Sequence, residues 1–303
     1  MVELRSYIPK VARSDVNVLI TGATGTGKER VAESIHYASA RRDDPFICVN
    51  CAAIPESLIE SELFGYERGA FTGAHDSYLG KLRLAGTGTV FLDEIGDMSL
   101  SAQAKVLRAI ESREVFPLGG RHVAHIEARF IAAVNQDLEP LLAENRFRRD
   151  LYYRLNVARI LLLPLNERSE DIPELVFHYL EHFNGRFHAE VEAPDAELLQ
   201  CLMSYTWPGN IREVRNLVEA IFIDPPLGPI SLADLPESFR RIFAVYARQA
   251  VPERERLVSA LYQTNWNKSK AAASLNWSRM TLYRKLEKYQ ILDPHDPSRS
   301  SDS

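Results

Sequence analysis

The first half of the chain alternates between short apolar runs and longer amphipathic stretches, which is the pattern of an α/β protein. The apolar runs are rich in β-branched residues, and several end at glycine or at a polar side chain, as buried parallel strands do. We expect strands at residues 16–21, 46–50, 89–94, 127–134 and 159–163. Apolar residues at helical spacing predict helices at 29–39, 55–64 and 99–111. The pattern therefore predicts a parallel sheet covered by helices.

After Pro164 the pattern becomes helical. Amphipathic segments that suit a small helical lid occupy residues 172–184, 196–204 and 211–223. A proline-rich break at 224–229 precedes residues 232–248, which we expect to be a mixed connecting stretch. Three further helices are predicted at 253–263, 267–275 and 278–288.

These patterns divide the chain into an α/β subdomain, a helical lid, an all-α unit and a disordered polar tail. The expected bounds are 1–163, 164–245, 246–293 and 294–303. The all-α unit has apolar residues at helical spacing that can form a small core: Leu257, Leu261, Ala271, Ala272, Leu275, Leu282 and Leu286. We expect Ser278 to be the N-cap of its last helix.

Composition excludes several classes of protein. No stretch of the 303 residues approaches the roughly 18 to 20 apolar residues of a membrane span, and the N-terminus has no signal-peptide core. We therefore expect a cytoplasmic protein with no membrane contact. The three cysteines form no disulfide framework or metal set, so we expect buried thiols. The net charge of −5 confines any DNA contact to a local basic patch.

The strand expected at 16–21 leads into a glycine-rich loop and then into a helix. The loop reads Gly22-Ala23-Thr24-Gly25-Thr26-Gly27-Lys28, the phosphate-binding pattern G-x-x-x-x-G-K in its required context. Its N–H groups can cradle phosphate oxygens, and Lys28 adds a charge at the β and γ phosphates. The alternative, a glycine-rich turn with a chance lysine, is disfavoured by the flanking strand and helix. Glu29 stands where the general motif has Ser or Thr on magnesium, so we count it in the nucleotide-binding loop without a metal-ligand role.

A second half of a nucleotide site follows at the end of the strand expected at 89–94. There Asp93 can bind magnesium through water, and Glu94 can orient and deprotonate an attacking water. Charged pairs also occur at strand ends by chance. Because this pair comes after the phosphate loop, in the order that a nucleotide site requires, we favour the site.

Between these two motifs lies the hexapeptide Gly69-Ala70-Phe71-Thr72-Gly73-Ala74. The flanking glycines let the backbone bend at both ends of an apolar tip. Either Phe71 folds back into the core, or the loop makes a mechanical contact with a partner. The hexapeptide resembles the loop that marks the bacterial enhancer-binding proteins, which are AAA+ ATPases that activate sigma-54 RNA polymerase.

The resemblance runs from about Val11 to about Leu292 and implies further site residues. It implies that Asn50 senses the nucleotide state, although a strand-end asparagine can equally cap a turn. Asn135 would be a polar sensor, and Arg148 and Arg154 would reach a neighbour's γ-phosphate across a ring interface. Basic residues on an amphipathic helix can instead be solvated. Arg212 matches the family's lid arginine, with a salt bridge to Glu213 as the alternative; Asn210 before it is a good N-cap candidate.

The C-terminal unit resembles the Fis-type helix-turn-helix of the same family. A plain helical bundle with a solvated basic face, which includes Lys270, is the alternative. The residues expected to bind double-stranded DNA are Lys268, Ser278, Arg279, Thr281, Arg284, Lys285 and Lys288.

The resemblance implies an AAA+ ATPase that forms a ring, expected to be a hexamer, on upstream DNA and uses ATP and Mg²⁺ to move the Phe71-Thr72 loop against sigma-54. A DNA-binding repressor or scaffold whose nucleotide site controls only assembly is the alternative from another class. A general protein-remodelling ATPase is disfavoured by the basic C-terminal unit. Only residues 1–15 precede the first expected strand, so we expect regulation by a partner protein, control by expression alone, or a truncated chain.

Overall fold

The computed structural model describes residues 2–250, 253–264, 266–275, 277, 279–289 and 291. By their internal contacts, residues 1–179 with 206–218 form one unit, and residues 180–205 with 219–303 form a second.

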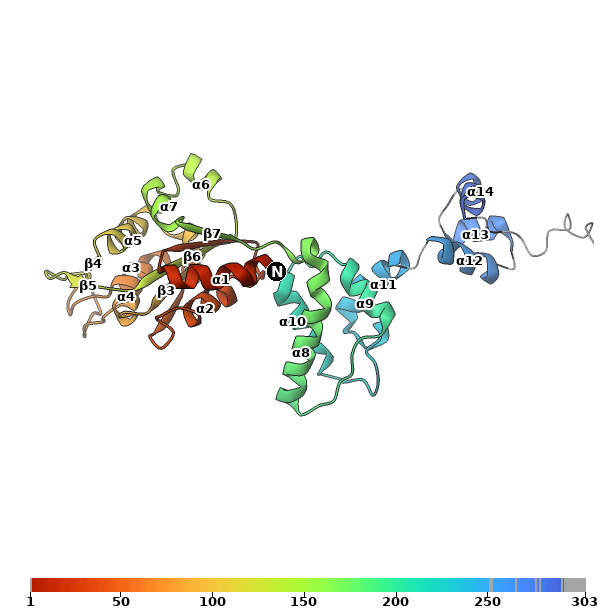
Figure 1. The fold of residues 1–303 in the computed structure, drawn as a ribbon, viewed down its shortest axis with the longest axis horizontal. Coiled ribbons are helices and arrows are strands. Elements are labelled where there is room, and N and C mark those ends of the chain that lie inside the picture. Colours follow the sequence, from red (N-terminus) through yellow and green to blue (C-terminus); the bar gives the residue numbers. More distant parts are fainter. Residues whose placement is uncertain are drawn as a thin grey trace, which may run out of the picture. The chain divides into compact units, whose positions relative to one another are not determined.

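The first unit is built on five parallel strands in the order β2-β3-β6-β1-β7 (Figure 1). Their bounds are β1 Val18–Thr21, β2 Phe46–Asn50, β3 Thr89–Asp93, β6 Arg129–Val134 and β7 Ala158–Leu161. All five expected strands are therefore present, with ends that differ by up to two residues. In the central strands β1, β3 and β6 nearly every residue is buried, which explains why their apolar runs are continuous.

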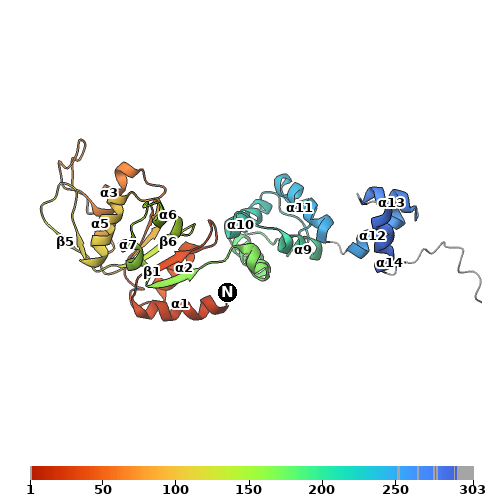
Figure 2. The same ribbon diagram turned by 90° about the horizontal axis from the view of Figure 1, so that it is seen from above.

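Helices cover both faces of this sheet. One face packs Val18, Ile20 and Ile131 against α1 (Val2–Ser14) and α2 (Lys28–Tyr37). The other packs Leu19 and Phe130 against helices that include α3 (Glu56–Phe64), α5 (Leu100–Glu111) and α7 (Arg149–Leu155). Figure 2 shows α1 running alongside α2 and β1. Helix α1 was not among the expected elements.

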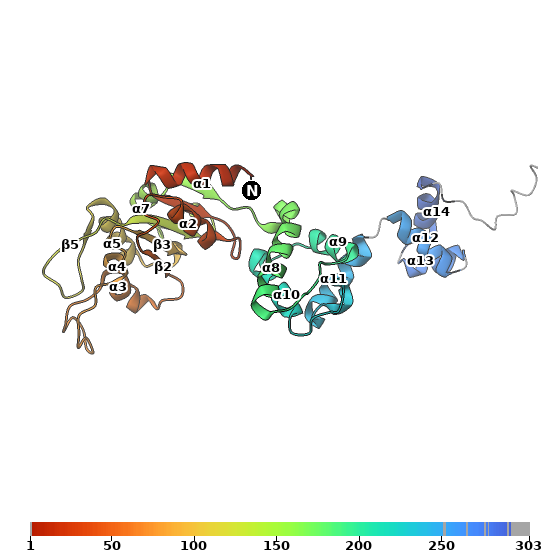
Figure 3. The same cartoon turned by 60° about the horizontal axis from the view of Figure 1, so that its bottom comes forward.

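Shorter elements complete the first unit. They are α4 Lys81–Leu84, α6 Glu139–Ala143, the 3-10 turns Ile95–Asp97 and Leu165–Asp171, and the hairpin of β4 Glu114–Val115 with β5 Ala124–His125. Helices α8 (Ile172–Phe187) and α10 (Asn210–Ile221) each begin in this unit. Figure 3 shows the segment after α3 extending away from the helices.

The second unit contains the rest of α8 and α10, together with α9 (Ala196–Ser204) and α11 (Glu237–Ala250). Asp195 caps α9 by accepting a hydrogen bond from the Leu198 N–H at 2.7 Å. Tyr205 packs edge-on against Phe243 of α11 at 5.1 Å between ring centroids. The expectation of a mixed connecting stretch at 232–248 is therefore wrong, because most of it is the helix α11, whose Phe243 is fully buried.

The C-terminal helices α12 (Glu253–Gln263), α13 (Lys268–Ser274) and α14 (Arg279–Lys288) enclose their own core. The expected core residues are confirmed: Leu257, Leu261, Ala271, Ala272, Leu282 and Leu286 are buried, and Leu275 packs against them. Asn267 caps α13 through the Lys270 N–H. The predicted cap Ser278 and the predicted disordered tail 294–303 lie outside the described residues.

The cysteines agree only in part with the expectation of buried thiols. Cys51 and Cys201 are buried, but Cys48 is exposed at the edge strand β2, so the expectation is wrong for Cys48. Partial desolvation, helped by the carboxylates of Glu29 and Asp93, raises the pKa of the Cys48 thiol to about 11. Desolvation also raises the pKa of Cys51 and of Cys201.

Candidate functional site

The loop from Gly22 to Lys28 has the geometry of a phosphate cradle. Gly25 and Gly27 have φ values of 79° and 99°, which favour glycine. A Cβ on Gly25 would lie 2.3 Å from the Gly209 carbonyl oxygen, so only glycine fits there. Thr26 is buried, and its hydroxyl donates to the Ala23 carbonyl at 2.7 Å. The loop is thus closed by its own contacts and feeds directly into the N-terminus of α2.

Lys28 connects this loop to the end of β3. Its ammonium group is nearly buried, donates to the Gly22 carbonyl at 3.0 Å, and lies 3.2 Å from a Glu94 carboxylate oxygen. Glu94 has a left-handed φ of 54° immediately after β3. The other oxygen of its carboxylate accepts a hydrogen bond from the Asn135 N–H at 2.9 Å. The structure therefore brings together the two motifs that the sequence places 65 positions apart.

A cavity of about 260 Å³ opens over these groups. Of the predicted nucleotide-site residues, those that line it are Thr24, Gly25, Gly27, Lys28, Glu29, Asp93, Glu94 and Arg212. Desolvation raises the pKa of both Asp93 and Glu94, although Lys28 works in the opposite direction on each. A site that holds two desolvated carboxylates beside a buried lysine suits a ligand that brings a cation and phosphate oxygens.

The residues present fit a divalent cation at Asp93. Its Oδ1 atom is buried and has no hydrogen-bond partner. A metal ion could coordinate this oxygen, or a metal-bound water could donate a hydrogen bond to it. Within the described residues no group of three or more His, Cys, Asp or Glu side chains could hold a metal. A cation here therefore needs ligands from phosphate and water, as Mg²⁺ commonly does.

Asp93→Asn is expected to stabilise the first unit by about 0.5–2 kcal/mol, the usual gain from a single stabilising substitution. The folded-state pKa of Asp93 is raised, so its ionised form opposes folding at neutral pH, and this cost is relieved as pH falls toward that pKa. Chemical denaturation at neutral pH measures the gain. The matched control, Asp150→Asn, should not stabilise, because Arg148 lowers the pKa of Asp150. An unchanged or lower stability for Asp93→Asn would contradict the inference that the ionised Asp93 carboxylate opposes folding.

The segment around Asn210 returns to the phosphate loop. Its amide donates to the Thr24 carbonyl at 3.0 Å and accepts from the Leu165 N–H at 2.8 Å, while the Ile211 N–H donates to the Gly25 carbonyl at 2.9 Å. The expectation that Asn210 caps α10 is wrong: its side chain is buried between two other segments, and its φ is 51°. This docking carries Arg212 to the cavity. The Glu213 carboxylate accepts from the Gly209 N–H at 2.8 Å.

Sequence reasoning missed several residues of this cavity: Arg30, Glu33, Tyr179, Ile211 and Arg215. Arg215 lies three positions after Arg212 on α10, a spacing that could have identified it. No sequence signal indicated Tyr179. A second cavity, of about 470 Å³, is lined by α1, by residues 159–163 and by Arg168.

Three other predicted site residues, Asn50, Arg148 and Arg154, do not line the cavity over the phosphate loop. The Asn50 side chain accepts from the Ala53 N–H at 3.0 Å, so it caps a turn, although β-sheet register puts Asn50 beside Asp93. Arg148 pairs with Asp150 at 2.7 Å, and Arg154 pairs with Glu111 at 2.6 Å. Neither arginine lines the cavity.

The hexapeptide forms an exposed loop above a small paired base. Tyr66 and Tyr78 exchange two backbone hydrogen bonds of 2.9 Å, and the Gly69 N–H donates to the Ala74 carbonyl. Gly69 and Gly73 have φ values of 83° and 102°. Phe71 is 43% exposed and touches the Tyr66 ring edge-on at 5.0 Å between centroids. The alternative in which Phe71 folds back into the core is therefore wrong.

The basic residues of the C-terminal helices are placed in part. Arg284 and Lys270 are exposed, Lys285 and Thr281 are half-buried, and the Lys268 ammonium lies 5.8 Å from the centre of the Tyr283 ring. For Arg279 and Lys288 the structure describes only the helical backbone of α14. Ser278 lies outside the described residues.

None of the helices in the described part of the chain combines the length and the apolar character that crossing a membrane requires.

Three protein families match successive parts of the chain. Their descriptions are "Sigma-54 interaction domain" at residues 1–161, "AAA+ ATPase lid domain" at 166–250, and "Bacterial regulatory protein, Fis family" at 250–289. The first covers more than half of the chain.

Relatives and solved structures agree with this match. The putative uric acid sigma-54-dependent transcriptional regulator UacR of Escherichia coli (strain K12) is 44% identical over 97% of this chain and 53% of its own length. The regulatory protein AtoC of the same organism is 42% identical over 98% of this chain and 67% of its own length. The crystal structure of NtrX from Brucella abortus in complex with ADP superposes with a TM-score of 0.72 at 32% identity, covering 95% of this chain and 68% of that one. The chain thus spans about half to two thirds of these proteins, and it belongs to the family of sigma-54-dependent transcriptional regulators with a sigma-54 interaction domain, an AAA+ lid and a Fis-type helix-turn-helix.

Proposed function

We propose that this chain hydrolyses ATP and uses the energy to remodel the closed complex of sigma-54 RNA polymerase into the open complex. The observation that carries the proposal is one cavity that gathers Lys28, Asp93, Glu94 and Arg212, on the same unit that presents the exposed Phe71. The first feature supports phosphate chemistry, and the second supports a contact with a partner.

The contacts of Lys28 suggest how the site responds to nucleotide. Lys28 pairs with Glu94 at 3.2 Å. Phosphate oxygens bound on the loop N–H groups compete for Lys28, which frees the Glu94 carboxylate to orient and deprotonate water. Asp93 would hold Mg²⁺, and the ion would supply positive charge beside the phosphate oxygens. Asn50 is in register with Asp93, and the Asn135 N–H donates to Glu94, so we assign both asparagines to sensing the γ-phosphate.

Arg148 and Arg154 act on a neighbouring subunit. Arg154 is exposed and Arg148 is half-exposed, and each pairs with an exposed carboxylate, Glu111 and Asp150, in a surface ion pair that adds little stability and that a phosphate can displace. Because neither lines its own cavity, we assign them to the γ-phosphate site of the next subunit in a homo-oligomeric ring, a hexamer.

The larger cavity is a candidate site for the nucleotide base. Its lining residue Leu162 adjoins the phosphate loop, since a Cβ on Gly22 would lie 2.7 Å from the Leu162 carbonyl oxygen. Arg168, also in the lining, donates to the Thr26 carbonyl at 3.1 Å. A mainly apolar cavity beside a phosphate cradle suits a planar base, here adenine.

The C-terminal helix-turn-helix binds an upstream site on double-stranded DNA, where exposed Arg284 faces the phosphates together with the other predicted basic residues. We propose a division into residues 1–163, 164–245 and 246–293 for the ATPase subdomain, lid and DNA-binding unit, followed by a tail. The protein works in the cytoplasm, where RNA polymerase is found, and a regulatory protein acting in trans is a further proposed partner.

Transcription in vitro tests this proposal. Purified chain with sigma-54 holoenzyme and a promoter carrying the upstream site should give transcripts with ATP and none without it. Thr72→Ala should lower the yield of transcripts tenfold or more, which corresponds to at least about 1.4 kcal/mol. ATP hydrolysis and DNA binding should persist, because Thr72 is exposed and contacts neither site.

The matched control is Thr87→Ala, which removes the same atoms from an exposed threonine outside the loop and should activate normally. Full activation by Thr72→Ala would instead favour a repressor or scaffold in which nucleotide controls assembly alone.

A further inference from the structure

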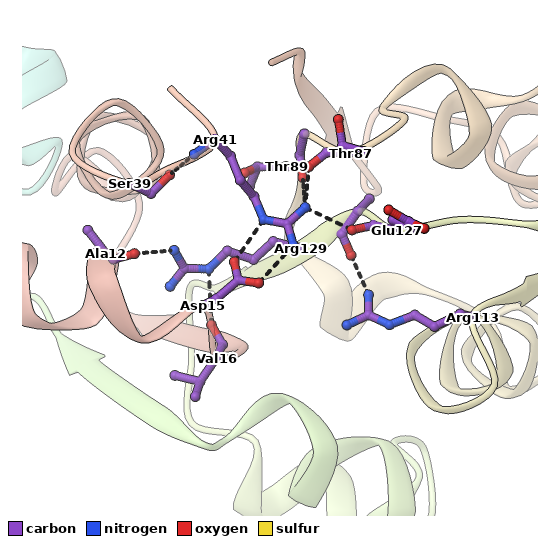
Figure 4. A network of polar contacts seen from close by, with 12 residues as sticks. Ala12, Asp15, Val16, Ser39, Arg41, Thr87, Thr89, Arg113, Glu127 and Arg129 are labelled. Carbon is purple, nitrogen blue, oxygen red and sulfur yellow. Dashed lines mark hydrogen bonds and ion pairs between the residues drawn. The ribbon is translucent and has the colours of Figure 1, made fainter. Parts of the chain in front are cut away.

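Two arginines hold the C-terminal end of α1 against the edge of the sheet where strands β3 and β6 begin (Figure 4). Arg129, the first residue of β6, is 1% exposed and donates to the carbonyl oxygens of Val11 at 2.9 Å, Ala12 at 3.3 Å and Val16 at 3.1 Å. The last carbonyls of a helix have no partner within the helix, and a cation is favourable there. Arg129 therefore closes the end of α1.

Arg41 secures the residue that follows α1. Its guanidinium donates to both Asp15 carboxylate oxygens, at 2.8 and 2.7 Å, in a bidentate pair. The same side chain donates to the Glu127 carbonyl at 2.8 Å and to the Thr87 carbonyl, just before β6 and β3. Figure 4 shows both guanidinium groups side by side at this end of the sheet. The position of α1 is thus tied to the strands that end at Asp93 and Val134.

The opposite end of α1 forms part of the larger cavity. Leu4, Ser6 and Tyr7 line it together with residues 159–163 and Arg168. Leu4 and Val11 are separated by about 10 Å along a helix with a rise of 1.5 Å per residue. A change in the angle of α1 therefore displaces the cavity wall. The phosphate loop is held by contacts that do not come from α1, both within the loop and from Asn210 and Arg168.

Burying a guanidinium among carbonyls is costly, since desolvation lowers the pKa of Arg129. A methionine of similar length would fill the same space without that cost. The presence of a buried arginine at this position is explained if the larger cavity, at the other end of α1, requires this helix to have a fixed position.

We infer that Arg129 and Arg41 are positioning residues for nucleotide binding: they fix α1 so that its first turns form one wall of the base cavity, and they act on the base and not on the phosphates. This inference rests on the proposed function, in which that cavity receives adenine.

The test compares ADP with inorganic tripolyphosphate, which can occupy the phosphate loop but has no base. For Arg129→Met in the full chain, the Kd for ADP and the KM for ATP should each rise about tenfold, comparable to the loss of one hydrogen bond to a charged group. The Kd for tripolyphosphate and kcat should stay within about twofold. Arg113→Met is the matched control: Arg113 donates to the Ala128 carbonyl in the same network but does not touch α1, and all four constants should be unchanged.

An equal loss of affinity for tripolyphosphate, a fall in kcat at unchanged KM, or no change in any constant would overturn the inference. Since Arg129→Met leaves buried carbonyls without a donor, thermal unfolding is followed in parallel. If that variant does not fold, the half-buried Arg41 decides: Arg41→Met should weaken ADP binding about threefold and tripolyphosphate binding not at all. If the unmodified chain binds ADP but does not turn over ATP, the proposed function fails, and the comparison of the two ligands still tests the role of α1.

Discussion

Glu94→Gln is expected to slow ATP hydrolysis by about 10²- to 10⁴-fold, the usual contribution of a general base. The substitution preserves the shape of the side chain and its hydrogen bond from the Asn135 N–H, but removes the carboxylate that Lys28 now holds at 3.2 Å. Nucleotide affinity should be retained or rise, since Lys28 becomes available to phosphate. Phosphate release under saturating ATP, together with binding of labelled ADP, measures the two effects.

The pH profile provides an internal check on this assignment. Desolvation raises the pKa of Glu94, so the active carboxylate is lost at a higher pH than for an ordinary glutamate as the solution is acidified. The part of the acidic limb that is due to Glu94 should disappear in Glu94→Gln, while the part due to Asp93, whose pKa is also raised, remains. Glu60→Gln is the matched control, because Glu60 pairs with Lys105 away from the cavity. Hydrolysis by Glu94→Gln at the unmodified rate would remove Glu94 from the chemistry.

Trp207→Ala should destabilise the first unit by about 3–5 kcal/mol, the range for a large aromatic residue removed from a core. Trp207 is fully buried, and its φ of 48° is imposed by the turn that returns the chain to the phosphate loop. Because this turn carries Arg212, nucleotide affinity should fall with stability. Urea unfolding followed by far-UV circular dichroism measures the change.

Phe177→Ala provides the comparison, since Phe177 is 46% exposed and its truncation should cost less than about 1 kcal/mol. An equal cost at both positions would show that Trp207 does not anchor the turn. Loss of stability without loss of affinity would show that Arg212 is placed by other contacts.

The sheet and the centre of the site could be predicted because buried parallel strands have a recognisable sequence pattern and a known arrangement of their ends. Continuous apolar runs mark strands buried on two faces, and their carboxyl ends meet at one edge. Lys28 after β1 and Glu94 after β3 therefore had to lie close together. The loop at Gly69 was predicted from its two glycines, and its exposure is confirmed by the structure.

The rest depends on contacts that local pattern does not encode. Asn210 has the residue type of a helix cap, yet its amide bridges Leu165 and Thr24, which are far away in sequence. Helix α1 contains Pro9 and has no strong start signal, so the sequence did not predict it. The contact of Arg129 with this helix could therefore not be predicted either. The burial of Phe243 on α11 depends on its contact with Tyr205, which follows α9, and the local sequence pattern does not predict that contact.

The protonated state of the native thiols makes the hexapeptide loop accessible to spectroscopy. Cys51 and Cys201 are buried, and the Cys48 thiol, whose pKa is raised to about 11, is almost entirely protonated at neutral pH. A single Ser77→Cys replacement on the exposed flank of the loop should thus react with a maleimide dye far faster than any of them. Fluorescence from that dye could report the movement of the loop in real time, turnover by turnover, without a cysteine-free background.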